Sequence, residues 1–282
     1  MAIRNPLVWT WEQVRLAAVT VEEAGHGDRV VPERLVVRRI GLADIRFALA
    51  KGLEDFNADP THYLFLCALY PLVGLIMARL ISGYGIVPLL FPLVSGFALI
   101  GPIAAVGIYE MSRRREAGEE VSWTDAFRVL QSPVIWEVVK LAAMFAAIFI
   151  LWVLAADLLY RVTLGPDQPQ SAGGFLHDVF TTGPGWALLI VGNALGFLFA
   201  LLTLVLGTVC FQAVLDHQVS AEIAIRTSIR AAWLNPGPIA AWGLTVAVIL
   251  AIGSIPILLG LAVAFPVLSH ASWHLYRRLV TV

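Results

Sequence analysis

The sequence contains few charged residues for its length. Asp, Glu, Lys and Arg together make up 14% of its 282 residues, whereas soluble domains contain about 25%. Hydrophobic residues make up 59%, so a water-soluble fold would lack the polar side chains needed to cover its surface. The composition therefore excludes an ordinary soluble domain and predicts a protein embedded in a membrane.

Cysteine is almost absent from the chain. Cys67 and Cys210 stand alone in separate apolar runs, a spacing that offers no metal-ligand set and predicts no disulfide. We expect both side chains to be buried as small hydrophobic groups. The chain also lacks a phosphate-binding glycine loop, a nucleophile elbow and a zinc-protease histidine pair. We therefore predict no catalytic, cofactor-binding or metal-binding residue and expect the protein not to be an enzyme.

Long apolar runs fill most of the chain after residue 60. About 20 apolar residues in a helix span a hydrocarbon core of about 30 Å, because each residue adds about 1.5 Å. On this criterion the predicted fold is an all-α polytopic transmembrane helical bundle with six crossings. The last apolar run could alternatively form one long tilted helix or a re-entrant pair. The predicted crossings are residues 62–81, 86–109, 134–160, 186–215, 239–253 and 256–276.

A proline separates a short polar helix from each pair of crossings, at Pro60, Pro133 and Pro236. Proline ends a helix because it lacks a backbone N–H and restricts the residue before it. The repeated order of helix, proline and two crossings predicts three helical hairpins, each preceded by an amphipathic interfacial helix. The intervals between the prolines are unequal, so common descent of the three units stays open.

The three short helices are expected to lie on the membrane surface, because apolar residues recur on one face of each. The first covers residues 44–57, and Ser122 and Ser220 are suited to cap the other two, with Asp125 at the capping-box spacing from Ser122. The expected apolar faces are Ile45, Leu49, Leu53 and Phe56 in the first helix, Trp123, Phe127 and Leu130 in the second, and Ile225, Ile229 and Trp233 in the third.

Residues 1–43 are predicted to be a cytoplasmic amino-terminal segment. No uninterrupted apolar core of a signal peptide occurs in them. Within this segment, residues 7–24 form either an amphipathic helix or part of a loosely ordered tail. Residues 44–282 are then expected to form a single transmembrane domain.

Basic residues are strongly biased to one side of the predicted membrane. Sixteen of the 19 Lys and Arg residues fall on the side that holds both termini, while Arg79 and Arg161 fall on the other side and Lys140 lies near the start of the third crossing. Cytoplasmic loops of membrane proteins carry an excess of positive charge. We therefore predict cytoplasmic amino and carboxy termini in a bacterial inner membrane.

The second crossing, residues 86–109, is unusually rich in proline and glycine. Such residues survive in a membrane helix where neighbouring helices, water or side chains satisfy the freed backbone groups. We therefore expect this helix to face protein more than lipid, as a kinked packing helix. A broken helix lining a substrate cavity is the alternative. The positions concerned are Pro92, Gly96, Gly101 and Pro102, together with Pro88 and Gly107.

Few polar residues interrupt the crossings. Glu137 and Lys140 lie three residues apart near the start of the third crossing, where they can pair and orient the helix or mark a functional site. Asn193 lies well inside the fourth crossing and is expected to make a hydrogen bond between helices. At the outer end of the third crossing, Asp157 and Arg161 have the spacing of a local ion pair.

The remaining polar candidates lie at crossing ends and in one loop. His270 and His274 are four residues apart and share a helical face, a spacing used by paired metal or haem ligands and equally by an interfacial pair. Between Arg161 and Gly185 the chain holds Asp167, His177 and Asp178 among Gly, Pro and Gln. We expect a solvated loop there.

Several stretches of the chain resemble a known family. They are Gly52-Leu53-Glu54-Asp55-Phe56-Asn57-Ala58-Asp59-Pro60, the Gly/Pro-rich second crossing, Tyr109 with Ser112-Arg113-Arg114-Arg115-Glu116-Ala117-Gly118, and Trp123-Thr124-Asp125-Ala126-Phe127. The pattern resembles a bacterial family of predicted integral membrane proteins with a domain of unknown function, sometimes loosely labelled cytochrome c oxidase subunit I-like. That family usually has tryptophan where this chain has Leu53. The resemblance covers the chain from about residue 36 and implies no established activity.

The histidines argue against a catalytic oxidase. A haem-copper core needs several histidines at membrane depth. Of the six histidines, His26 and His177 fall in predicted loops, and the other four fall at crossing ends. We therefore reject that role, although an accessory role beside a respiratory complex stays open.

Two functions are compatible with this pattern, and an enzyme acting on lipid or haem is kept as a third to be checked. We favour a non-enzymatic membrane assembly, scaffold or regulatory component, because no polar pathway crosses the predicted helices. The alternative is a small-molecule or ion transporter or channel built from tandem hairpins. The expected partners are anionic lipids on the cytoplasmic face, attracted by the basic cluster Arg113, Arg114 and Arg115, and other membrane proteins or a second copy, with no nucleic acid.

Overall fold

The computed structural model describes residues 35–58, 87–97, 99, 101–165, 171–256 and 259–281. Within these residues the chain is helical apart from short connections and two strands of two residues each. The predictions for residues 7–24, the crossing at 62–81, Pro60 and Cys67 lie outside the described part of the chain. The structure therefore supports the all-α class, while the number of crossings stays a prediction.

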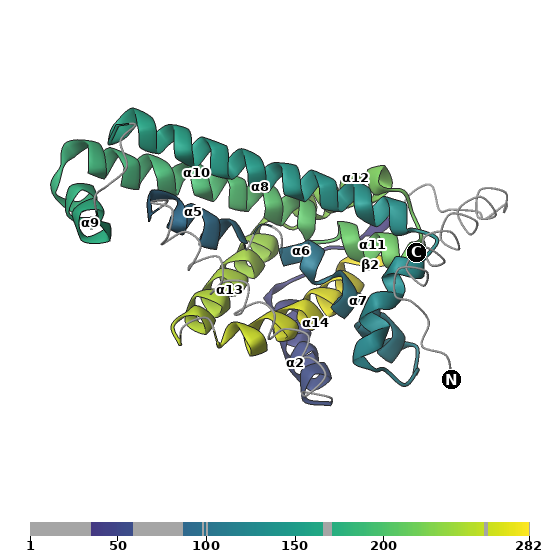
Figure 1. Ribbon diagram of the computed structural model, residues 1–282. Helices are drawn as coiled ribbons and strands as arrows, with labels where there is room; N and C mark the ends of the chain where they lie inside the picture. Colours follow the sequence, from purple (N-terminus) through teal and green to yellow (C-terminus); the bar gives the residue numbers. More distant parts are fainter. Residues whose placement is uncertain are drawn as a thin grey trace, which may run out of the picture.

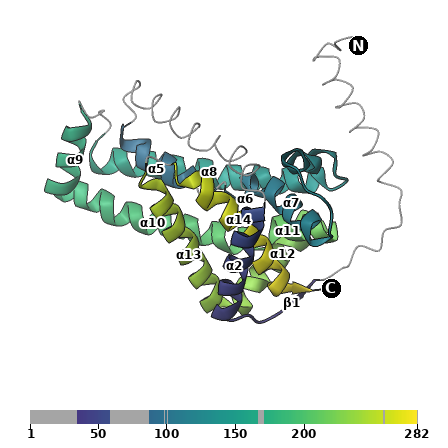
Figure 2. The ribbon, with the colours of Figure 1, turned by 90° about the horizontal axis from the view of Figure 1, so that it is seen from below.

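In the described residues, three helices are long and apolar enough to cross a membrane. The first is α8, Ile135–Thr163. The second is α10, Gly183–Gly207, which continues after a short interruption into α11, Cys210–His217. The third is α13, Pro236–Ser254. Figure 1 shows α8 and α10 lying side by side as a long pair, and α13 crosses them at an angle in Figures 1 and 2.

Small residues allow α10 to pack closely against α8. A Cβ atom added at Gly192 would lie 3.5 Å from the Leu159 side chain, and one at Gly196 would lie 3.1 Å from the Trp152 ring. The Trp152 ring also packs on Phe199, with 5.6 Å between ring centroids. Close approach of backbones through glycine is a common way for membrane helices to associate. Helices α8 and α10 therefore pack closely against each other.

The connection between α8 and α10 was expected to be a loop, and the structure corrects this. It contains α9, Ala172–Thr181. The Ser171 side chain caps this helix by accepting a hydrogen bond from the Gly174 N–H at 3.0 Å, which is the ordinary role of an N-cap serine. Gly185 packs so closely on α9 that an added Cβ would overlap the Asp178 carbonyl oxygen. The Ser171 cap and the close packing at Gly185 thus define the structure of the connection between α8 and α10.

The second predicted crossing is three short helices in place of one. They are α5, Val87–Phe97, α6, Gly101–Ala104, and α7, Val106–Glu116. Pro92 lies inside α5, and its carbonyl oxygen accepts a hydrogen bond from the Trp152 indole N–H of α8 at 2.8 Å. A Cβ at Gly96 would lie 2.7 Å from Trp152. The Trp152 side chain of α8 therefore donates a hydrogen bond to the irregular backbone of α5, as expected for a helix that packs against protein.

Two further positions predicted for this segment, Gly101 and Pro102, lie in α6. A Cβ on Gly207 would lie 3.0 Å from the Pro102 ring, so α6 packs against the last turn of α10. Gly101 has more room, because its added Cβ would meet only Phe265, at 3.9 Å. Helix α10 ends at Gly207, and the chain continues as α11 within the same candidate span. From Cys210 to Leu215 every residue of α11 is buried, which confirms the expected burial of Cys210.

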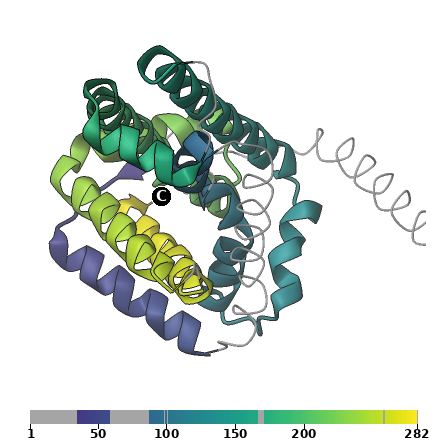
Figure 3. The same cartoon turned by 60° about the vertical axis from the view of Figure 1, so that its left-hand side comes forward.

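The first surface helix is α2, Leu42–Ala58, and one of its faces is buried by α14, Leu261–Leu279. Figure 3 shows α2 lying along α14. Leu53 of the predicted apolar face is 49% exposed, and Gly52 lies in the contact with α14. A Cβ at Gly52 would lie 2.6 Å from the Ala271 backbone nitrogen. The two helices are too close for a larger residue at this point.

Both ends of the described chain are tied together beside α12, Ala221–Leu234. Strand β1, Val36–Val37, pairs antiparallel with β2, Val280–Thr281. Asn235, buried between α12 and α13, accepts a hydrogen bond from the Ile40 N–H at 2.8 Å and donates one to the Arg38 carbonyl at 2.9 Å. The Asn235 side chain thereby fixes the position of the backbone segment that leads into α2.

The other two predicted surface helices are present. The first is the 3₁₀ helix η2, Trp123–Gln131, in which the Ser122 N–H donates to Asp125 as the capping-box spacing predicted. Its predicted apolar face, Trp123, Phe127 and Leu130, is exposed, while Ala126 and Val129 are buried. In α12 the buried face consists of small residues, while Trp233 is 81% exposed. The larger apolar residues therefore point away from the core, and the small ones allow close packing.

Candidate functional site

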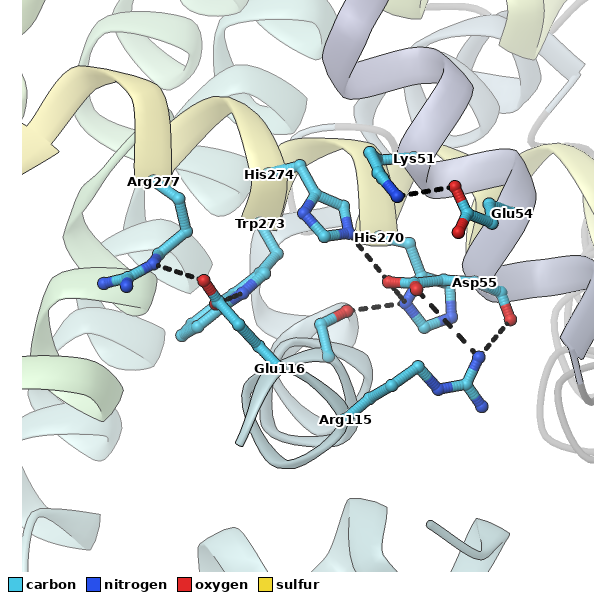
Figure 4. A network of polar contacts seen from close by, with 10 residues as sticks. Lys51, Glu54, Asp55, Arg115, Glu116, His270, Trp273, His274 and Arg277 are labelled. Atoms are coloured by element: carbon cyan, nitrogen blue, oxygen red, sulfur yellow. Dashed lines mark hydrogen bonds and ion pairs between the residues drawn. The ribbon is translucent and has the colours of Figure 1, made fainter. Parts of the chain in front are cut away.

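Polar side chains from three helices meet around Asp55 near the end of α2. The His274 Nε2 of α14 lies 2.8 Å from Asp55 Oδ2, and the His270 Nδ1 lies 3.6 Å from the same oxygen. From α7, Arg115 donates a hydrogen bond to the Asp55 backbone carbonyl at 2.6 Å. Figure 4 shows these groups converging between α2, α7 and α14. We call Asp55, Ser112, Arg115, His270 and His274 the Asp55 cluster.

Local helix geometry brings the cluster together. His270 and His274 are one turn apart on α14 and therefore face the same neighbour. Gly52 lets α2 approach that face, which places Asp55 one turn further along against both rings. His270 is fully buried. Burial by itself raises the pKa of Asp55, but the hydrogen bond with His274 and the electrostatic effects of His270, His274 and Arg115 outweigh it, so the pKa lies below its ordinary value.

The cluster contains serine, histidine and aspartate, but not in the geometry of a hydrolytic triad. In a triad the serine and the carboxylate use different ring nitrogens of one histidine. Here Ser112 Oγ lies 2.6 Å from His270 Nδ1, and the Asp55 carboxylate faces the same nitrogen. The arrangement therefore does not activate the hydroxyl for attack, and it can act as a polar clamp between helices.

A second set of contacts continues from the cluster along α14. Trp273 donates an indole hydrogen bond to Glu116 of α7 at 3.0 Å, and Arg277 pairs with the same carboxylate at 3.0 Å (Figure 4). Arg277 also reaches Asp216 of α11 at 2.9 Å, where the Tyr276 hydroxyl donates at 2.9 Å. The last two turns of α14 are thus joined by polar contacts to α2, α7 and α11.

The predicted basic cluster at the end of α7 is largely engaged within the protein. Arg113 binds Glu110 through two hydrogen bonds, of 2.8 and 2.7 Å. Arg114 contacts both Glu110, at 3.0 Å, and Glu119, at 2.6 Å. Arg115 belongs to the Asp55 cluster. The structure therefore gives these arginines structural contacts in addition to any role at the lipid surface.

Glu137 and Lys140 form the predicted ion pair, at 2.6 Å, and Glu137 has a second role that the sequence did not indicate. Its other carboxylate oxygen accepts a hydrogen bond from the Ala221 N–H at 2.7 Å, at the start of α12. This contact joins residues 84 positions apart, so no local pattern could reveal it. At the other end of α8, the predicted pair Asp157 and Arg161 is confirmed at 2.7 Å.

Asn193 is exposed on α10, and its amide N–H donates to the Leu189 carbonyl of its own helix at 2.8 Å. Among the described residues nothing on another helix provides the predicted interhelical hydrogen bond.

The remaining candidates are also not joined into a site. His177 and Asp178 are exposed on α9, and the described part of the chain contains no group of three metal-ligating side chains that could hold a metal ion.

The arrangement from α5 to α11 coincides with a family match. Residues 90–216 match the model of a family described as a predicted integral membrane protein, DUF2189. Over these residues the chain is similar to that family. The DUF2189 segment contains the three-part second crossing, the arginines of α7, η2 and the α8–α10 hairpin. Gly52–Pro60 of the resemblance lies before it. No curated protein and no solved structure matches the chain.

Proposed function

We propose that the protein is a non-enzymatic membrane component that assembles with other membrane proteins as a scaffold or regulator. The support comes first from α10, the second half of the α8–α10 hairpin. Only 6% of the most apolar stretch of this helix and its continuation is buried within the protein. Such a surface needs lipid or another protein to cover it. The exposed apolar residues of α10 include Ile190, Val191, Phe197, Leu198, Leu201 and Leu202.

The observation that carries assembly is the exposed amide of Asn193 among these side chains. In hydrocarbon, an amide without hydrogen-bond partners is unfavourable by several kcal/mol, about 4 or more on alkane transfer scales. The contact with Leu189 uses one N–H donor, whereas an asparagine side chain has two donors and an acceptor. A facing helix from another membrane protein would satisfy the remaining groups, which makes this face of α10 suited to assembly.

The proposal includes six crossings in three hairpins, with both termini in the cytoplasm of a bacterial cell. Trp136 near the start of α8 and Trp186 near the start of α10 are exposed at opposite ends of this antiparallel pair. Tryptophan is enriched at both edges of a bilayer. The arginines of α7 and α14 adjoin the Trp136 end, which is then the cytoplasmic one. The domain division at residue 43 remains part of the same prediction.

The transporter or channel alternative is favoured by one observation, the interruption of the second crossing between α5 and α7. Broken helices often form substrate sites in transporters. Against a substrate cavity here, the carbonyl of Pro92 and the space beside Gly96 are occupied by the side chains of Trp152 and Phe149. We therefore rank transport second.

We expect Asn193→Leu to weaken assembly because it removes the amide while keeping the helix apolar. Interhelical hydrogen bonds in membranes contribute about 0.6–2 kcal/mol, which corresponds to association weakened about 3- to 30-fold. The measurement is native electrophoresis of complexes released by a mild detergent. Ala194→Leu, at the adjacent exposed position, is the matched control and should leave the complexes intact. A wild-type protein that migrates only as a monomer would contradict the proposal.

A further inference from the structure

A polar cavity opens at the end of the molecule that holds the arginines of α7. Its volume is about 280 Å³, and it lies between α7, η2, the turn that precedes α8 and the end of α11. Arg113 and Arg114 line it from α7, Arg128 lines it from η2, and Ser132 lies where η2 leads into α8. We propose that this cavity binds the head group of an anionic phospholipid, one with a single phosphodiester and an uncharged polyol.

The charges of the cavity fit such a head group. Three guanidinium groups line the cavity with two carboxylates, Glu110 and Asp216, while Glu119 and Asp125 pair with Arg114 and Arg128 outside this lining. Glu110 is already held by Arg113 and Arg114. Asp216 is held by Arg277 and the Tyr276 hydroxyl. A phosphodiester has one negative charge, and guanidinium groups bind phosphate oxygens through several N–H donors.

The three arginines retain N–H groups for a ligand. Arg114 contacts Glu110 through its Nε and Glu119 through its Nη1, so its Nη2 is not used in these contacts. Arg128 contacts Asp125 through its Nε alone. Because a guanidinium has five N–H donors, these contacts do not saturate it. The N-terminus of α8 adds partial positive charge at the same side of the cavity. The hydroxyl groups of a polyol would donate hydrogen bonds to the carboxylates of Glu110 and Asp216.

The surroundings of the cavity favour a lipid over a free anion. The helix η2 is a 3₁₀ helix, so residues three positions apart share a face. Arg128 and Gln131 line the cavity on one face, while Phe127 and Leu130 on the next face are exposed. Trp136, two residues into α8, is exposed as well. Acyl chains can therefore lie against apolar side chains while the phosphodiester enters the cavity.

This inference rests on the proposed function, because it requires the arginine end to lie at the cytoplasmic edge of the bilayer. The test is native mass spectrometry of the detergent-purified full chain with added phosphatidylglycerol or phosphatidylcholine. We expect the wild type to bind phosphatidylglycerol about tenfold more tightly, and Arg128→Glu to lose about tenfold of that affinity. Because Arg128 is more than half exposed, this variant should fold, and its thermal melting reports whether it does.

Arg226→Glu is the matched control, since Arg226 is also an exposed arginine paired with a carboxylate on its own helix. Its affinity for phosphatidylglycerol should change less than about twofold. Equal losses in the two variants would show general attraction to basic surfaces and overturn the site, as would a wild type without lipid preference. Competition by inorganic phosphate at the same concentration as the lipid would indicate a soluble-anion site instead. Extraction of membranes with alkaline carbonate separates these outcomes, because release of the protein would contradict the proposed function itself.

Discussion

Replacing Gly52 with valine is expected to separate α2 from α14 and to lower the free energy of unfolding by about 3 kcal/mol. An added Cβ would lie 2.6 Å from the Ala271 nitrogen and 2.7 Å from the Val267 carbonyl oxygen. Both are backbone atoms, so no side-chain rotation can relieve the overlap. The helices would have to move apart, and the contacts of Ile45, Ala48 and Phe56 would weaken with them.

The measurement is thermal unfolding of the purified protein in detergent, with limited trypsin digestion as a local probe. Separation of α2 should expose Arg46 and Lys51 to rapid cleavage. Gly173→Val is the control, because Gly173 is also a helical glycine but has open space around its Cβ position. Its stability should change by less than about 0.5 kcal/mol. Similar behaviour of the two variants would refute the close packing of α2 on α14.

Replacing Asp55 with asparagine is expected to lower the free energy of unfolding by about 3 kcal/mol. The change removes the charge that faces His270, His274 and Arg115 in a site where the Asp55 side chain is only 12% exposed. Removing one partner of a buried charged group leaves the others without compensation, which is more unfavourable than losing an exposed pair. Glu54→Gln is the control, because Glu54 pairs with Lys51 in an exposed position, and its effect should stay below about 0.5 kcal/mol.

The loss in Asp55→Asn should also depend on pH. The pKa of Asp55 is lower in the folded protein than its ordinary value, so the charged carboxylate stabilises the fold above the unfolded-state pKa of about 3.9. That contribution disappears as the pH falls through the lower folded-state pKa. The difference in stability between wild type and variant should therefore be full at pH 6 and shrink below about pH 4. A difference that is already absent at pH 6 would contradict the clamp.

Local sequence patterns predicted the positions of the helices better than they predicted which residues contact one another. The range predicted for α8, residues 134–160, lies within three residues of the helix in the structure, because Pro133 and a continuous apolar run define it. The capping residues Ser122 and Ser220 were also found from local spacing. In α9, by contrast, the helix is short and lies among Gly and Pro, so its signal was too weak to separate it from a loop.

The candidate site could not be predicted because its partners are distant in sequence. Asp55 and His274 are 219 residues apart, and the choice of Gly52 over Leu53 for the packed face depends on how close α14 lies. The spacing of His270 and His274 showed that they share a face, but it did not show what they face. Proline marked the irregularity of the second crossing, while its hydrogen bond with Trp152 joins residues 60 positions apart and could not be read from local spacing.

The central claim is that α8 and α10 span the membrane as a hairpin, with the arginine end of α7 in the cytoplasm. Its most direct test is labelling of single cysteines, in a chain with Cys67 and Cys210 replaced by alanine, by a membrane-impermeant maleimide on spheroplasts. We predict that cysteine at Gly173 in α9 reacts in intact spheroplasts and that cysteine at Ala117 reacts only after permeabilisation. Cysteine at Asn193 should react only in denatured protein. Labelling at Ala117 in intact spheroplasts, or of cysteine at Asn193 from the aqueous side, would contradict the account.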